Sequence, residues 1–72
     1  MEVADYEITT QELIPPIGNI YTHCAAISWV YIKTSEGNKR IDVNLGEVHG
    51  ESEGDARTKM KAKFEKWLSE QA

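Results

Sequence analysis

The sequence has little cysteine and lacks any long apolar run. Its 72 residues include a single cysteine, Cys24, so no disulfide can form within the chain. Small secreted domains usually carry several cysteines, and this scarcity favours a reducing, cytoplasmic compartment. Met1 to Asp5 form an acidic rather than an apolar start, and no segment has the roughly 20 apolar residues of a membrane-spanning helix. We therefore expect neither a signal peptide nor a contact with the membrane.

Basic residues are also in short supply. Eight Lys and Arg stand against 12 Asp and Glu, which gives a net charge of −4. Proteins that bind nucleic acids or anionic membranes are usually basic, so this balance disfavours both classes. Hydrophobic residues make up 40% of the chain, as is typical of a folded protein. We expect a single domain over residues 1–72, with a small core that a partner or a second copy would help to stabilise.

The C-terminal third predicts one amphipathic helix. Ser52, followed three residues later by Asp55, is typical of a helix N-cap. The residues that then recur at three- and four-residue spacing, and so form one apolar face, are Ala56, Met60, Phe64, Trp67 and Leu68. This pattern predicts a helix from about residue 53 to about residue 71.

Two strands are predicted ahead of the helix. Residues 20–33 are rich in β-branched and aromatic side chains, and residues 39–48 alternate between apolar and polar ones. The segment between them favours a three-residue hairpin loop, with Gly37 in the left-handed conformation. A weaker strand is expected over residues 3–10, before Pro15 and Pro16 end regular structure and Gly18 and Asn19 form a turn.

The hairpin register decides which side chains face the helix. A three-residue loop pairs Tyr31 with Ile41, Trp29 with Val43 and Ile27 with Leu45, and all six then face the helix. We expect this register because it buries the aromatic rings. A loop of two or four residues reverses the parity. Val30 and Ile32 would then enter the core with Ile41 and Val43, and Trp29 and Tyr31 would turn outward.

The expected fold is α+β, a three-stranded antiparallel sheet with one C-terminal amphipathic helix packed on one face. The first hairpin strand is apolar on both faces, and one helix covers only one face of a small sheet. The second face then needs a cover, either residues 3–17 or a second copy or another protein. In the expected register, the residues that line this partner-binding face are Cys24, Ala26, Val30 and Ile32.

No motif indicates catalysis. His23 immediately precedes Cys24 on an expected strand, where neighbouring side chains point to opposite faces, so His23 is poorly placed to activate the thiol. His49 lies on an expected loop. The paired ligand spacings of a zinc site and the lysine of a phosphate-binding glycine loop are both missing. We expect no enzyme activity, no cofactor or metal, and no small-molecule substrate.

Residues 27–68 resemble the arm-type DNA-binding domain of tyrosine recombinases and the plant AP2 domain. The similarity lies in Trp29-Val30-Tyr31-Ile32-Lys33, Gly37-Asn38-Lys39-Arg40, Leu45-Gly46-Glu47-Val48 and Ser52-Glu53-Gly54-Asp55-Ala56. Those families lay a three-stranded sheet in the major groove and support it with a helix. The resemblance implies DNA contacts by Lys33, Lys39 and Arg40. The sequence departs from the pattern at Asp42, Asn44 and Glu47, which would face the phosphates, and an acidic sheet would repel them.

The distribution of charge completes the sequence-based expectation. From Asp55 onward five basic residues face three acidic ones, whereas the rest of the chain has three basic and nine acidic residues. Lys59, Lys63 and Lys66 lie on one flank of the expected helix, where they could hold an acidic partner or simply form a solvated face. We expect a non-catalytic protein-interaction module (an adaptor, inhibitor or regulatory subunit) that binds a protein or itself, a role that would suit a phage-type accessory protein. The alternative is an arm-type or AP2-like nucleic-acid-binding domain that uses residues 27–48.

Overall fold

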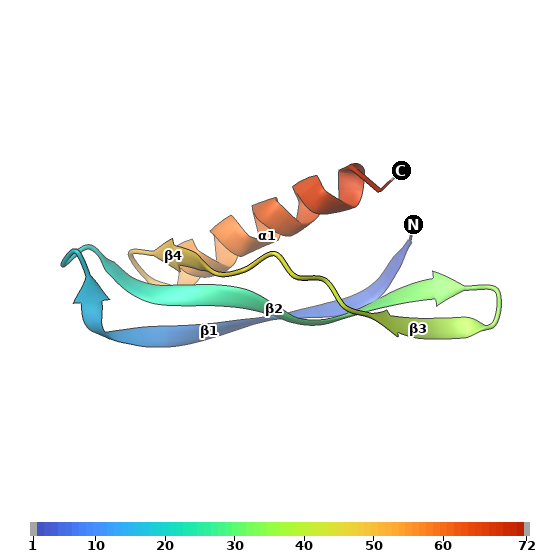
Figure 1. The fold of residues 1–72 in the computed structure, drawn as a ribbon, viewed down its shortest axis with the longest axis horizontal. Coiled ribbons are helices and arrows are strands. Elements are labelled where there is room, and N and C mark those ends of the chain that lie inside the picture. The colour runs from blue at the N-terminus through green and yellow to red at the C-terminus, as the bar shows by residue number, and fades with distance from the viewer. Residues whose placement is uncertain (1, 72) are drawn as a thin grey trace.

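A long antiparallel hairpin forms the body of the protein (Figure 1). The computed structural model describes residues 2–71, in the order β1 (Val3–Ile17), β2 (Tyr21–Thr34), β3 (Gly37–Ile41), β4 (Val48–Gly50) and α1 (Glu53–Ser69). β2 lies at the centre of the sheet, with β1 on one side and both β3 and β4 on the other. The expected α+β class, an antiparallel sheet with one C-terminal helix, is confirmed. The molecule is elongated, with extents of 47 × 19 × 17 Å.

Helix α1 begins and packs as its sequence predicts. The Ser52 side chain accepts a hydrogen bond from the backbone N–H of Asp55 at 3.1 Å, which satisfies one of the free donors at the helix start. The buried face consists of Ala56, Met60 and Phe64, while Trp67 is only half-buried. Within residues 2–71, no helix is long and apolar enough to cross a membrane.

Gly50 allows the helix to approach the sheet closely. It is buried at the end of β4, and a Cβ atom at this position would lie 2.3 Å from the backbone nitrogen of Ala56. Only glycine fits so close to another backbone. This contact places the first turn of α1 directly against the short strand β4.

The hairpin between β2 and β3 has a shorter loop than expected. Thr34 pairs with Gly37, and Val30 therefore pairs with Ile41. Gly37 has the predicted positive φ of 114°, but the three-residue loop was wrong. The reversed parity, which was the alternative, is correct at this end of the sheet: Val30 is fully buried, and Trp29 and Tyr31 point away from the helix side.

A bulge at Ser28 changes the direction of the side chains within β2. Ile8 pairs with Ile27 whereas the adjacent Glu7 pairs with Trp29, so Ser28 has no partner on β1. An extra residue of this kind resets the alternation along a strand. As a result Ala25 and Ile27 on one side of the bulge, and Val30 on the other, all face the helix.

The second predicted strand, residues 39–48, is divided into two. β3 pairs with Thr34 to Val30 of β2, β4 pairs with Ala25 to His23, and residues 42–47 leave the sheet between them. Asn44 Oδ1 accepts a hydrogen bond from the N–H of Gly46, whose φ is 69°. This turn directs Leu45 onto the core cluster beside the helix.

The N-terminal strand is longer than predicted and contains the two prolines. β1 continues to Ile17, with a register shift between Glu12 and Ile17. Proline is tolerated there because β1 is an edge strand whose outer N–H groups need no partner. The turn at Gly18 and Asn19 was correctly predicted, with φ values of 62° and 58°.

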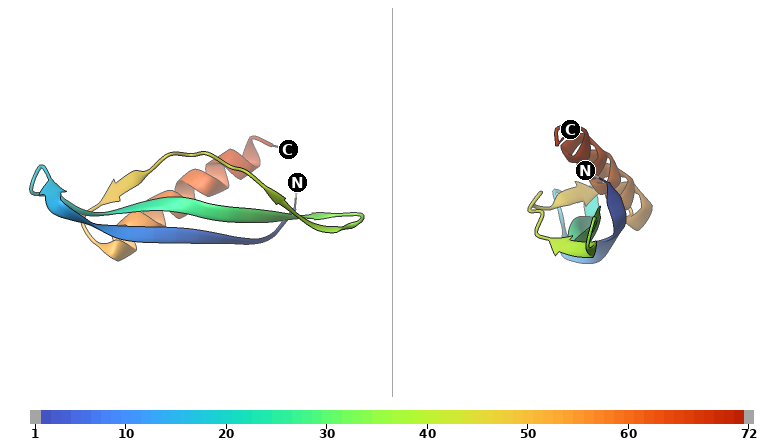
Figure 2. Two further views of the ribbon diagram at one scale, coloured as in Figure 1. Left: turned by 60° about the horizontal axis from the view of Figure 1, so that its bottom comes forward. Right: turned by 90° about the vertical axis from the view of Figure 1, so that its right-hand side faces the viewer.

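One face of the sheet is left without a covering layer. Because β1 pairs with β2 edge to edge, it widens the sheet and does not fold across its second face, so residues 3–17 are not the cover that the sequence suggested. Figure 2 shows α1 and the segment 42–47 on the same side of the sheet. We call the sheet face opposite α1 the outer face, and the described residues place no element over it.

Candidate functional site

The outer face has an apolar strip along β2 and polar side chains along β1. Its β1 residues are Asp5, Glu7, Thr9 and Gln11, which pair in turn with Tyr31, Trp29, Ala26 and Cys24 of β2. The four β1 residues alternate and so share a face, and paired residues of neighbouring strands point the same way. Their four β2 partners therefore lie on one surface, with the bulge at Ser28 between Ala26 and Trp29. The apolar surface is therefore one strand wide.

Two aromatic rings form one end of this strip. The ring centroids of Trp29 and Tyr31 are 5.3 Å apart, and the rings meet edge to face at 67°. Both side chains are half-buried. Arg40 of β3 pairs with Tyr31 on the side opposite Asp5. The aromatic pair is thus bordered by acidic groups on β1 and by a basic group on β3.

The four residues predicted to line a partner-binding face do not form one surface. Cys24 and Ala26 are on the outer face, where they line a depression of about 340 Å³. Val30 and Ile32 face the helix side, and Val30 lies in the core. The bulge at Ser28 causes this division, and the one polar residue within the apolar run from Cys24 to Ile32 was the signal for it in the sequence.

The three predicted nucleic-acid contacts are divided as well. Arg40 pairs with Tyr31 and Lys33 lies two residues beyond Tyr31, so both are on the outer face. Lys39 pairs with Ile32 and is on the helix side. Lys33 also forms an ion pair with Glu2 at 3.3 Å, which partly neutralises its charge.

Cys24 and His49 are brought together by the fold. They are direct partners across β2 and β4, a pairing that the sequence left open. Cys24 is only 6% exposed, and the His49 ring lies against Tyr21 with a centroid separation of 6.0 Å. No hydrogen bond joins the thiol to the imidazole, and residues 2–71 contain no group of three or more potential metal-binding side chains. The pair lacks the activated geometry of a nucleophilic site.

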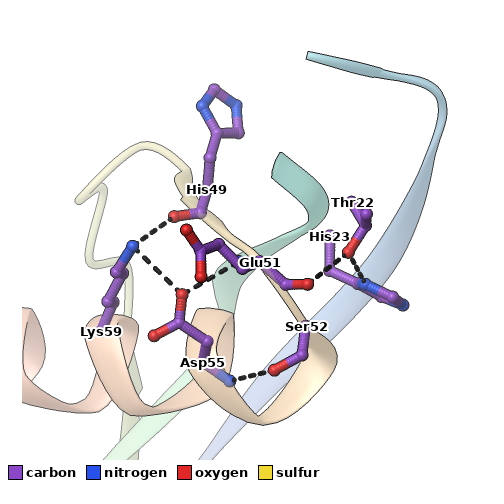
Figure 3. A network of polar contacts seen from close by, with 7 residues as sticks. All are labelled: Thr22, His23, His49, Glu51, Ser52, Asp55 and Lys59. Atoms are coloured by element: carbon purple, nitrogen blue, oxygen red, sulfur yellow. Dashed lines mark hydrogen bonds and ion pairs between the residues drawn. The ribbon is translucent and has the colours of Figure 1, made fainter. Parts of the chain in front are cut away.

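A polar network holds the junction between β2, β4 and α1 (Figure 3). Thr22 donates to the carbonyl of Glu51 at 2.8 Å, and Lys59 donates to the carbonyl of His49 at 3.1 Å. The hydrogen bond from the Glu51 N–H, together with Lys59, lowers the pKa of Asp55. Since the ionised Asp55 also sits in the first turn of the helix, this network stabilises the fold and shows no reactive group.

Large apolar side chains are exposed at the turn between β1 and β2. We call Leu13–Ile20 the hairpin tip. Its exposed fractions are 83% for Ile14, 46% for Ile17 and 54% for Ile20. Coverage of the second sheet face by residues 3–17 was one of the alternatives that the sequence left open, and Ile14 and Ile17 are instead exposed at the tip. The signal for a tip was the pair of prolines followed by a Gly-Asn turn within an uncharged, apolar stretch that begins after Glu12.

A second apolar surface lies beside the C-terminal half of α1. Leu45 and Trp67 form its floor, and Lys63, Lys66 and Glu70 form its rim, around a space of about 260 Å³. We call it the helix groove. Lys63 donates a hydrogen bond to the carbonyl of Leu45, which attaches the segment 42–47 to the helix.

The chain matches no protein-family model, and no curated protein or solved structure shows significant similarity to it.

Proposed function

We propose that the protein is a small non-catalytic protein-interaction module that acts as an adaptor, inhibitor or regulatory subunit. The observation that supports this proposal is the Trp29–Tyr31 pair, which lies on a sheet face that none of the described residues covers. Tryptophan and tyrosine are the residues that most often carry the binding energy of protein interfaces. The binding surface is the outer face, and its partner is a protein.

The charges around the aromatic pair fit this role. Asp5 and Glu7 border the pair on one side and Arg40 on the other. An apolar centre surrounded by charges of both signs is the usual anatomy of a protein–protein interface. The rim charges then select the orientation of the partner, while the rings supply affinity.

The proposal predicts that Trp29→Ala weakens partner binding by more than tenfold without unfolding the protein. Loss of a buried aromatic anchor typically costs about 2 kcal/mol or more of binding energy. A photo-crosslinking residue at position 31 identifies the partner, and isothermal titration calorimetry then measures its affinity for the wild type and the variant. Thr58→Ala, on the exposed side of α1, is the matched control. If Trp29→Ala binds the identified partner as tightly as the wild type, the outer face is not the binding surface.

A second candidate is nucleic-acid binding by the same face. It is favoured by one observation, that Lys33 and Arg40 share the outer face with Trp29 and Tyr31. Aromatic rings beside cations are the elements of a base-stacking surface. Asp5 and Glu7 on the same face oppose it, because they repel phosphates. The protein-binding role therefore remains the primary proposal.

We expect no salt-dependent binding to duplex DNA at micromolar protein concentration. Fluorescence anisotropy with a labelled duplex, at low and at physiological salt, measures this directly. Low-micromolar affinity that falls with salt, and that is lost in a protein carrying both Lys33→Ala and Arg40→Ala, would support the nucleic-acid role in place of the protein-binding one.

A further inference from the structure

The hairpin tip is an apolar projection with an acidic base. It extends past the start of α1 and past β4 (Figure 1), and Ile14 at 83% exposure is its most exposed large apolar side chain. Glu12 of β1 pairs with His23 at the base of the tip, and Glu51 lies on the other side of β2, after Gly50, where its backbone carbonyl accepts a hydrogen bond from Thr22. Within residues 2–71 neither carboxylate forms an ion pair. The projection therefore combines uncovered aliphatic surface with unneutralised negative charge.

The helix groove has the opposite properties. Its floor, Leu45 and Trp67, is apolar and half-buried, and its space of about 260 Å³ exceeds the roughly 150 Å³ apolar cavity that accepts a benzene molecule. Lys63 and Lys66 outnumber Glu70 on the rim. Neither lysine is in an ion pair with another described residue. The groove is thus an apolar recess with excess positive charge.

We infer that the hairpin tip of one copy inserts into the helix groove of a second copy. The aliphatic side chains of the tip would cover Leu45 and Trp67, and Glu12 and Glu51 would approach Lys63 and Lys66. An exposed apolar projection that fits a recess elsewhere on the same molecule produces a head-to-tail contact. Because the two surfaces lie on different parts of the chain, the first copy keeps a free groove and the second keeps a free tip, so the contact can propagate along a row of copies.

Two other binding partners fit the tip less well than the helix groove. A contact between two tips would bring the acidic bases of both copies together, which like charges oppose. Insertion of the tip into an anionic membrane meets the same repulsion. The inference does not depend on the outer face, because neither the tip nor the groove includes Trp29 or Tyr31.

Self-association tests the inference. Sedimentation velocity and light scattering of the wild type, from micromolar to millimolar concentration, should show a mass that rises with concentration. Ile14→Asp should weaken the association by roughly tenfold or more, because it places a charge at an apolar contact. This side chain is largely exposed, so the variant should keep the wild-type circular dichroism spectrum and melting temperature. A wild type that stays monomeric at millimolar concentration overturns the inference.

The groove side has its own variant and a matched control. Lys66→Glu reverses a charge on the groove rim and should weaken association by roughly five- to tenfold. Lys61→Glu reverses the charge of another exposed lysine of α1, next to Tyr6 and Ile8 and away from the groove, and should leave association unchanged. Equal effects of the two reversals would mean that net charge alone, not the groove, controls association.

Mixing the variants distinguishes a contact between a tip and a groove from a contact between two tips or between two grooves. The Ile14→Asp protein keeps an intact groove, and the Lys66→Glu protein keeps an intact tip. An equimolar mixture should therefore form a heterodimer that cannot extend, while each variant alone remains monomeric at the same concentration. A mixture that also remains monomeric overturns the inference, as does association that responds to Ile14→Asp but not to Lys66→Glu. Binding of the wild type to neutral lipid vesicles in the absence of self-association would assign the tip to membranes.

Discussion

Replacing Val30 with aspartate is expected to unfold the protein. Val30 has no exposed surface, pairs with Tyr6 on β1, and lies on the sheet face where the Tyr6 ring packs on Phe64 at 4.6 Å. A charge at this position would be buried without a partner, at a cost above about 4 kcal/mol. That is close to the whole stability of about 4–11 kcal/mol expected for a chain of 72 residues. Circular dichroism and thermal melting measure the loss of folded protein.

Tyr31→Asp is the matched control for this prediction. It introduces the same charge one residue along the same strand, on the outer face, where water still reaches the side chain. The loss of the edge-to-face contact with Trp29 should cost only about 0.5–1.5 kcal/mol, and the like charge of Asp5 on the neighbouring strand adds about 1 kcal/mol or less, so this variant should remain folded. The opposite result, with Val30→Asp folded and Tyr31→Asp unfolded, would restore the three-residue loop and its register.

Phe64→Ala should have the second-largest effect, a loss of about 3–5 kcal/mol in the free energy of unfolding. Phe64 is 2% exposed, and its ring packs between Tyr6 at 4.6 Å and Trp67 at 5.8 Å. Truncation leaves a cavity between the helix and β1 that neighbouring side chains cannot fill. Urea denaturation followed by circular dichroism measures the change. A denaturation midpoint equal to that of the wild type would show that the packing of α1 on the sheet contributes little to stability.

Trp67→Ala should destabilise the protein less than Phe64→Ala. The helical spacing alone assigns the two residues to the same apolar face, but Trp67 is half-buried and borders the helix groove. Less apolar surface returns to water when it is truncated, and solvent can occupy the space that it leaves. Equal losses for the two variants would mean that the helix groove is closed in solution.

Much of the candidate site could not be read from the sequence. The two-sided apolar character of residues 24–32 correctly indicated a second face, since Trp29 and Tyr31 lie there with Cys24 and Ala26. The individual assignments failed because side-chain parity depends on the loop length and on the bulge at Ser28. A shift of one residue at either point moves every later side chain to the opposite face.

The sequence by itself determined the features that depend on neighbouring residues. The cap at Ser52, the start of α1 and its buried stripe of Ala56, Met60 and Phe64 follow from hydrogen bonds and spacing within a few positions. The turn at Gly18 and Asn19 is local in the same sense, because its backbone angles are a property of those residue types. Elements of this kind are determined by local interactions, so they can be predicted without the rest of the fold.

Only the tertiary structure decided how these elements meet. The extension of β1 through Pro15, the departure of residues 42–47 from the sheet and the exposure of Ile14 all depend on which edges remain free after β2 pairs with its neighbours. The close approach of Gly50 to Ala56 joins segments from different elements. Pairing between strands and packing on the helix are long-range contacts, so their free energies choose among registers that local propensity leaves nearly equal. The outer face, the hairpin tip and the helix groove are consequences of that choice.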